Sequence, residues 1–83
     1  MVLEDLRKAK RRSVGTRETT KAVQKGLARA VFVARNAEPH VTEPLLRLCQ
    51  EKAVEVVMVD DMEELGAACG IDVGSASAAI LRD

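Results

Sequence analysis

Two short apolar runs constrain the fold of this chain more than any other feature. Ala30–Ala34 is continuously apolar but too short for a buried helix, so it predicts a central β-strand. Val54–Val59 is rich in β-branched residues and gives the strongest strand signal in the sequence. We predict that both strands lie inside one sheet.

Around these runs, the spacing of apolar residues predicts four helices and two further strands. The predicted helices cover residues 2–10, 16–25, 41–52 and 62–68, and the further strands cover residues 13–15 and 77–81. The last segment fits either a helix or a strand, and we assign it as a strand because it completes the alternation. Helix and strand then alternate along the chain, which implies an α/β fold with about four strands and helices on both faces of the sheet.

Residues at the predicted helix ends support these boundaries. Thr16 is a candidate N-cap for the second helix, and Gly26 stands where a helix prefers glycine after its last turn. Asp60 and Asp61 follow the Val54–Val59 strand and are candidate caps for the fourth helix, which Gly70 ends. A turn at residues 36–39 precedes the third helix.

The composition supports a single domain over residues 1–83 and argues against an enzyme. The chain has one histidine, His40, and two isolated cysteines, Cys49 and Cys69, which we interpret as buried thiols. No motif for a metal or cofactor is present. Without a membrane span or signal peptide, we expect a cytoplasmic protein, and nothing demands more than a monomer.

The charges are divided unevenly although the whole chain is neutral. Residues 1–26 carry eight cations against three carboxylates, and the remaining 57 residues carry the balancing negative charge. A positive end of this kind can meet a polyanion such as RNA. An ordinary solvated face on two amphipathic helices explains the pattern equally well.

The segment Gly15–Lys21 has the most specific chemistry in the sequence. A helix that begins here presents free backbone N–H groups, and Arg17 and Lys21 share one face with Glu18 beside them. A carboxylate accepts from guanine N1–H and N2–H when these are not in Watson–Crick pairs, while cations contact guanine O6 and N7 or phosphates. The alternative is an ordinary charged helix surface, in which Arg17 and Lys21 are solvated and Glu18 stabilises the helix start by roughly a few tenths of a kcal/mol. Because Phe32 is the only aromatic residue, base stacking on aromatic side chains is disfavoured.

Two separated segments resemble one family. Gly15–Gly26 (GTRETTKAVQKG) and, far downstream, Leu65–Val73 (LGAACGIDV) resemble the kink-turn-binding ribosomal proteins of the archaeal L7Ae type, especially their small bacterial YbxF-type branch. The resemblance implies a three-layer α-β-α sandwich with a mixed sheet. It also implies a structured RNA partner with a kink-turn, either ribosomal RNA or a riboswitch, and an association with the ribosome.

The same resemblance assigns the RNA-binding residues. They lie at the helix start and in a later loop: Gly15, Thr16, Arg17, Glu18, Lys21, Ile71, Asp72 and Val73. In that family the residues matching Glu18 and Lys21 contact the tandem sheared G·A pairs, and the apolar loop residues pack on an extruded nucleotide.

The chain departs from the archaeal pattern at several positions. Arg17 replaces an asparagine, Ala67 occupies a position that is often basic, and Gly74 replaces a common proline. Asp60 and Asp61 add negative charge on the side expected to face RNA. We therefore predict weaker RNA affinity than that of archaeal relatives. The departures also leave open an alternative function, a protein–protein adaptor that keeps the fold and has lost RNA recognition.

Overall fold

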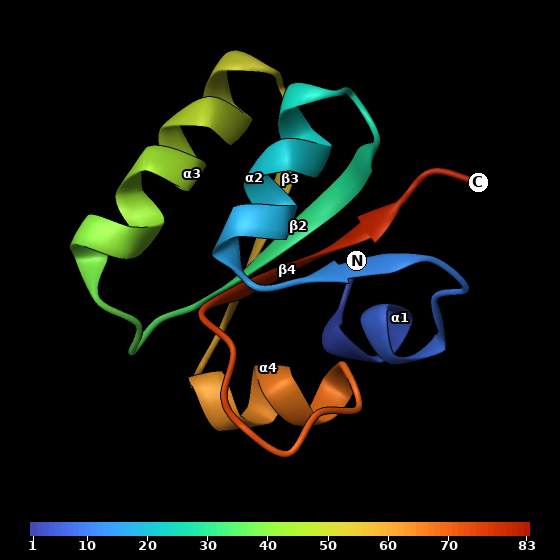
Figure 1. Cartoon of the computed structure of the whole chain (residues 1–83), viewed down its shortest axis with the longest axis vertical. Coiled ribbons are helices and arrows are strands. Elements are labelled where there is room, and N and C mark those ends of the chain that lie inside the picture. Colours follow the sequence, from blue (N-terminus) through green and yellow to red (C-terminus); the bar gives the residue numbers. More distant parts are fainter.

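A four-stranded sheet lies between two pairs of helices in the computed structural model, which describes all 83 residues (Figure 1). The elements in chain order are α1 (Leu3–Lys8), β1 (Arg12–Val14), α2 (Thr16–Gln24), β2 (Ala28–Ala34), α3 (Pro39–Glu51), β3 (Glu55–Val59), α4 (Met62–Ala68) and β4 (Ser77–Leu81). The predicted alternation of helices and strands is confirmed. No boundary differs from its prediction by more than two residues.

The sheet is mixed, as the family resemblance implied. Its strand order is β1-β4-β2-β3, in which β4 runs antiparallel to both β1 and β2, whereas β2 and β3 are parallel. The predicted central position of the Val54–Val59 strand is wrong, because β3 lies at an edge, where Met58 is 38% exposed. Its apolar residues are explained by the helices that cover both of its faces, since α3 and α4 each contact β3.

The two faces of the sheet carry separate cores. Helices α2 and α3 cover one face, where Val31 and Leu45 are buried. Helices α1 and α4 cover the other, around the fully buried Phe32 and Leu65. Each such side chain contributes about 1.5–3 kcal/mol on burial. The result is the three-layer sandwich expected from the sequence.

The N-cap of helix α2 lies one residue earlier than predicted. Gly15, not Thr16, is the N-cap, with φ 92° and ψ 154°, and Thr16 is the first helical residue. The Thr16 hydroxyl makes no capping bond, because it hydrogen-bonds Ser77 instead. The other end of α2 agrees with the prediction: Gly26 has φ 74°, and its N–H donates to the Val23 carbonyl while that of Leu27 donates to Ala22.

Only one of the two aspartates proposed as caps for α4 acts as one. The Asp61 carboxylate accepts a hydrogen bond from the Glu64 N–H at 2.7 Å. The Asp60 carboxylate is not a cap; it lies 3.7 Å from the Arg35 guanidinium. Gly70 follows the last turn of α4 with φ 79°, as predicted.

The candidate reactive side chains lie where the sequence placed them. Cys49 and Cys69 are buried and free, and burial raises the pKa of both thiols, an effect that the nearby Arg12 opposes at Cys69. His40 is exposed and lies 3.2 Å from the Glu38 carboxylate. No helix has the length and apolar character that crossing a bilayer requires.

Candidate functional site

The first turn of α2 is fixed to the start of β4 by two hydrogen bonds. The Gly15 N–H donates to the Ser77 carbonyl at 2.9 Å, and the hydroxyls of Thr16 and Ser77 lie 2.7 Å apart. One turn further on, the fully buried Thr19 hydroxyl lies 3.2 Å from that of Ser13 on β1. The hydroxyls of Thr16 and Thr19 therefore face the sheet and set the position of the helix.

The charged side chains of the same turn face solvent. Arg17, Glu18 and Lys21 are all exposed, and Arg17 has no carboxylate within ion-pair distance. Glu18 and Lys21 form an ion pair at 3.7 Å, with 61% and 50% of their side chains exposed. An ion pair this open to water is worth roughly 0–1 kcal/mol, so a ligand can separate it at little cost.

The second predicted segment is the loop between α4 and β4. It lies against α4 at Gly66, where a Cβ atom would fall 2.0 Å from the Val73 carbonyl oxygen. At its tip Val73 is 70% exposed and Asp72 is exposed, whereas Ile71 is partly buried. With Ala67 and Glu63 these residues line an open hollow on the protein surface. The loop therefore presents apolar surface to solvent on a fixed support.

The loop and the start of α2 meet at Ser77. After Gly74 the chain is held by Ser75, whose N–H donates to the Met62 carbonyl and whose hydroxyl donates to the Ser77 carbonyl at 2.7 Å. Ser77 then contacts Gly15 and Thr16, as described above. In Figure 1 this segment rises from the loop beside α4 to the start of β4, near the first turn of α2. All eight predicted residues thus belong to two segments at one end of the sheet.

Two residues that position this site were not found from the sequence. Ser77 is polar within a buried strand, and only its contact with residues 61 or more positions earlier explains it. Gly66 belongs to a glycine repeat with Gly70 and Gly74, and this spacing was the available signal for close packing of the loop.

Arg12 was also missed, and it stabilises the opposite side of the sheet. Its guanidinium donates to the Leu6 and Arg7 carbonyls at the end of α1 and to the Cys69 carbonyl at the end of α4. It therefore serves two helix C-termini, where cations are favoured. Of the eight cations in residues 1–26, at least this one has a structural role.

Comparison with known proteins gives one consistent family. The model of the ribosomal protein L7Ae/L30e/S12e/Gadd45 family matches residues 1–83. An RNA-binding protein of Bacillus pumilus is 43% identical over 68 residues, which cover 82% of this chain and 83% of the relative. Large ribosomal subunit protein eL8 of Halobacterium salinarum is 48% identical over 68 residues, 81% of this chain and 57% of that protein. The structure of a 15.5 kD RNA-binding protein of Giardia lamblia superposes with a TM-score of 0.87 at 28% identity, covering 98% of this chain and 71% of that one.

Proposed function

Because this chain belongs to the ribosomal protein L7Ae/L30e/S12e/Gadd45 family, we propose that it binds RNA and recognises the kink-turn through the start of α2 and the α4–β4 loop. The observation that carries the proposal is the junction at Ser77, which holds the two segments together. A single folded RNA can therefore touch both segments. The relatives named as RNA-binding and ribosomal proteins support the same partner class.

In the proposed complex Glu18 reads guanine. Its exposed carboxylate accepts hydrogen bonds from guanine N1–H and N2–H, which sheared G·A pairs leave free of Watson–Crick partners. Lys21, released from Glu18, contacts guanine O6 and N7 or a nearby phosphate. Arg17 adds a cation at the positive end of α2, where the free N–H groups also favour phosphate.

The loop provides the second half of recognition. Ile71 and the exposed Val73 cover the face of an extruded nucleotide by apolar contact. Asp72 lies between them and offers an acceptor to that nucleotide's donors. Only the sharply bent RNA brings guanine edges and the extruded base to one surface, so binding shifts the RNA population toward the bend.

Titration of a kink-turn RNA and a control with disrupted G·A pairs tests the proposal. Wild-type protein should bind the intact RNA more tightly. Glu18→Ala should lose about 1–3 kcal/mol on the intact RNA and little on the control. Equal losses on the two RNAs would mean that Glu18 reads no base.

Lys21→Ala tests the charge contribution. It should weaken binding and reduce the slope of log affinity against log salt by about one unit, since one phosphate contact is lost. An unchanged slope would remove Lys21 from the phosphate contacts.

A surface groove on another side of the molecule favours a second candidate, the protein–protein adaptor. Val2, Leu3 and the exposed Met58 line it beside the edge strand β3, with carboxylates from Asp60 and Glu64 at its rim. A basic, apolar protein segment fits this surface. An adaptor that has lost RNA recognition would not distinguish the intact from the disrupted RNA, so the same titration separates the two functions.

A further inference from the structure

A second group of cations lies at the opposite end of β4 from the proposed kink-turn site. Its members come from α1, the α1–β1 turn, β2 and the segment after β4: Lys8, Lys10, Arg11, Arg29 and Arg82. We call them the β4-end cluster. Figure 1 shows the α1–β1 turn and the C-terminal segment together at one side of the sheet, away from the start of α2.

Backbone contacts hold the cluster in place. The Leu81 N–H donates to the Arg11 carbonyl at 3.0 Å, and the Arg82 N–H donates to the Leu27 carbonyl at 2.7 Å. The Arg11 guanidinium donates in turn to the Arg82 carbonyl at 3.0 Å. Three segments far apart in the sequence are thereby fixed beside one another.

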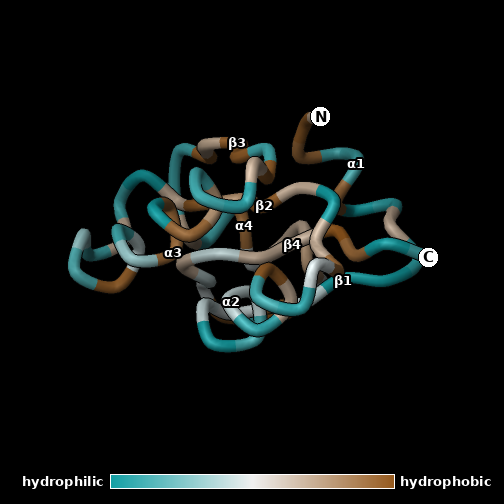
Figure 2. The backbone as a smooth tube through the Cα atoms, turned by 90° about the horizontal axis from the view of Figure 1, so that it is seen from above, coloured by the Kyte–Doolittle hydropathy of each residue, from teal (hydrophilic) through white to brown (hydrophobic).

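The charges of the cluster are not neutralised within the protein. All five side chains are exposed, and none lies within 4.0 Å of a carboxylate, in contrast to Arg7, Lys21 and Arg35. Asp83 follows Arg82 in the chain, and Asp5 is close to Lys8, but the Asp5 carboxylate accepts a hydrogen bond from the Val2 N–H. Figure 2 shows the hydrophilic backbone segments at this end, near the C-terminus.

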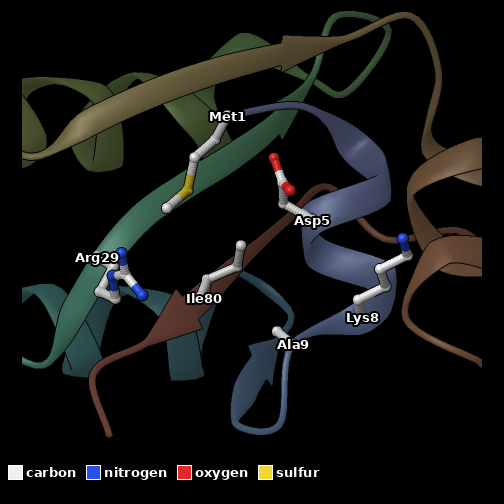
Figure 3. A pocket seen from close by; sticks show the side chains of 6 residues that line it. All are labelled: Met1, Asp5, Lys8, Ala9, Arg29 and Ile80. Atoms are coloured by element: carbon white, nitrogen blue, oxygen red, sulfur yellow. The ribbon is translucent and has the colours of Figure 1, made fainter.

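Two of the cations border a surface hollow. Figure 3 shows Lys8 from α1 and Arg29 from β2 on opposite sides of Ile80, with Ala9 beside it. Met1 and Asp5 also line the hollow, and the Asp5 carboxylate there accepts a hydrogen bond from the Val2 N–H. The apolar Ile80 side chain lies between Lys8 and Arg29, so a ligand backbone can approach both cations.

We propose that the β4-end cluster binds the sugar–phosphate backbone of a second RNA segment without reading its bases. Lysine and arginine are the usual phosphate contacts, and in an A-form RNA helix the major groove is too deep and narrow for them to reach guanine O6 and N7. The five residues of β4 separate it from the start of α2 by about 14 Å, so the two sites contact different phosphates. The inference rests on the proposed function in taking RNA as the ligand.

Two matched variants test the cluster. Lys8→Ala with Arg29→Ala removes two exposed cations from the cluster, and Arg47→Ala with Lys52→Ala removes two exposed cations from the α3 region. The net charge of the two proteins is the same. Affinity is measured by fluorescence anisotropy across a salt series on three RNAs: a kink-turn with short arms, the same kink-turn with one long arm, and a straight duplex. Melting curves confirm that both proteins fold.

The cluster variant should lose about tenfold in affinity for the long-armed RNA and about two units of its salt slope. Its binding to the short-armed kink-turn should be unchanged, as should all binding by the α3 variant. Equal effects of the two variants, or unchanged slopes for both, would overturn the inference. Binding to vesicles containing phosphatidylserine is measured in parallel. A cluster variant that loses only this binding, and none to RNA, would also overturn the inference.

Failure of the proposed function gives a different result. Wild-type protein would then not distinguish the intact kink-turn from one with disrupted G·A pairs. The cluster would still be expected to steepen the salt dependence on the straight duplex, and Lys8→Ala with Arg29→Ala to reduce it.

Discussion

Replacing Gly66 with alanine is expected to destabilise the protein and displace the α4–β4 loop, although alanine is the better helix former. Gly66 lies inside α4. An added Cβ would fall 2.0 Å from the Val73 carbonyl oxygen, 3.1 Å from its carbonyl carbon and 3.2 Å from the Gly74 Cα. All three are backbone atoms, so no rotation of a side chain relieves the contact.

The magnitude follows from two opposing terms. Alanine in place of glycine favours a helix by roughly 0.5–1 kcal/mol. Overpacking costs about 1–3 kcal/mol, and the upper part of this range applies because the loop backbone must move by about 1.4 Å to bring the 2.0 Å contact to an ordinary 3.4 Å. The expected net loss is about 1–2 kcal/mol, which lowers the melting temperature of a chain this size by roughly 5–15 °C.

Urea unfolding and amide exchange test this prediction. Ala67→Gly is the matched control for helix propensity. Ala67 is exposed in the same helix and borders the hollow beside the loop, but its replacement adds no atom against the loop backbone. In Gly66→Ala the Ser75 amide, which donates to the Met62 carbonyl, should exchange faster. Affinity for a kink-turn RNA should fall while its salt dependence stays constant, because no cation is lost. A Gly66→Ala protein more stable than wild type would refute the steric argument.

Three further predictions concern stability. Arg12→Ala should cost about 1–2 kcal/mol in urea unfolding, because three carbonyls at two helix ends lose their donor, and should leave the salt slope of RNA binding unchanged. Gly26→Ala should cost about 1–2 kcal/mol by the same assay, because alanine is strained at φ 74°. No atom lies within 4 Å of an added Cβ, so the whole cost comes from the backbone conformation. Because the folded-state pKa of Cys49 and Cys69 is raised above 9.0, stability should be unaffected below pH 9 and fall as pH rises further, and the double alanine variant should flatten that decline.

The strands show what an apolar pattern can and cannot specify. The run at β3 correctly indicated a strand with helices on both faces, but helices also contact an edge strand, so its apolar residues do not reveal that it is less buried than the central β2. β4 gave the weakest signal, yet it is paired on both sides at the centre of the sheet, as β2 is. Its alanines are fully buried because α2 and α4 lie against it. Lateral position depends on these long-range contacts, which local sequence does not encode.

The candidate site shows a similar division. The charged residues of α2 could be selected from the sequence because their spacing fixes one helical face. The hydroxyls that position them could not, since the Thr16–Ser77 bond joins residues 61 positions apart. The same long-range bond explains the wrong N-cap: a threonine beside a glycine fits either position, and the partner on β4 decides between them.

In the proposed complex, the open ion pair between Glu18 and Lys21 explains how oppositely charged residues can serve one anionic ligand. Before RNA arrives, each neutralises the other at 3.7 Å in a solvated setting, so neither imposes a large desolvation cost on the folded chain. A guanine edge offers donors to the carboxylate and acceptors to the ammonium at the same time, and so replaces both halves of the pair. A phosphate alone satisfies only Lys21 and leaves Glu18 repelled. The pair therefore favours a base edge over bare backbone, whereas the β4-end cluster, which has no such ion-paired carboxylate, carries no equivalent selectivity.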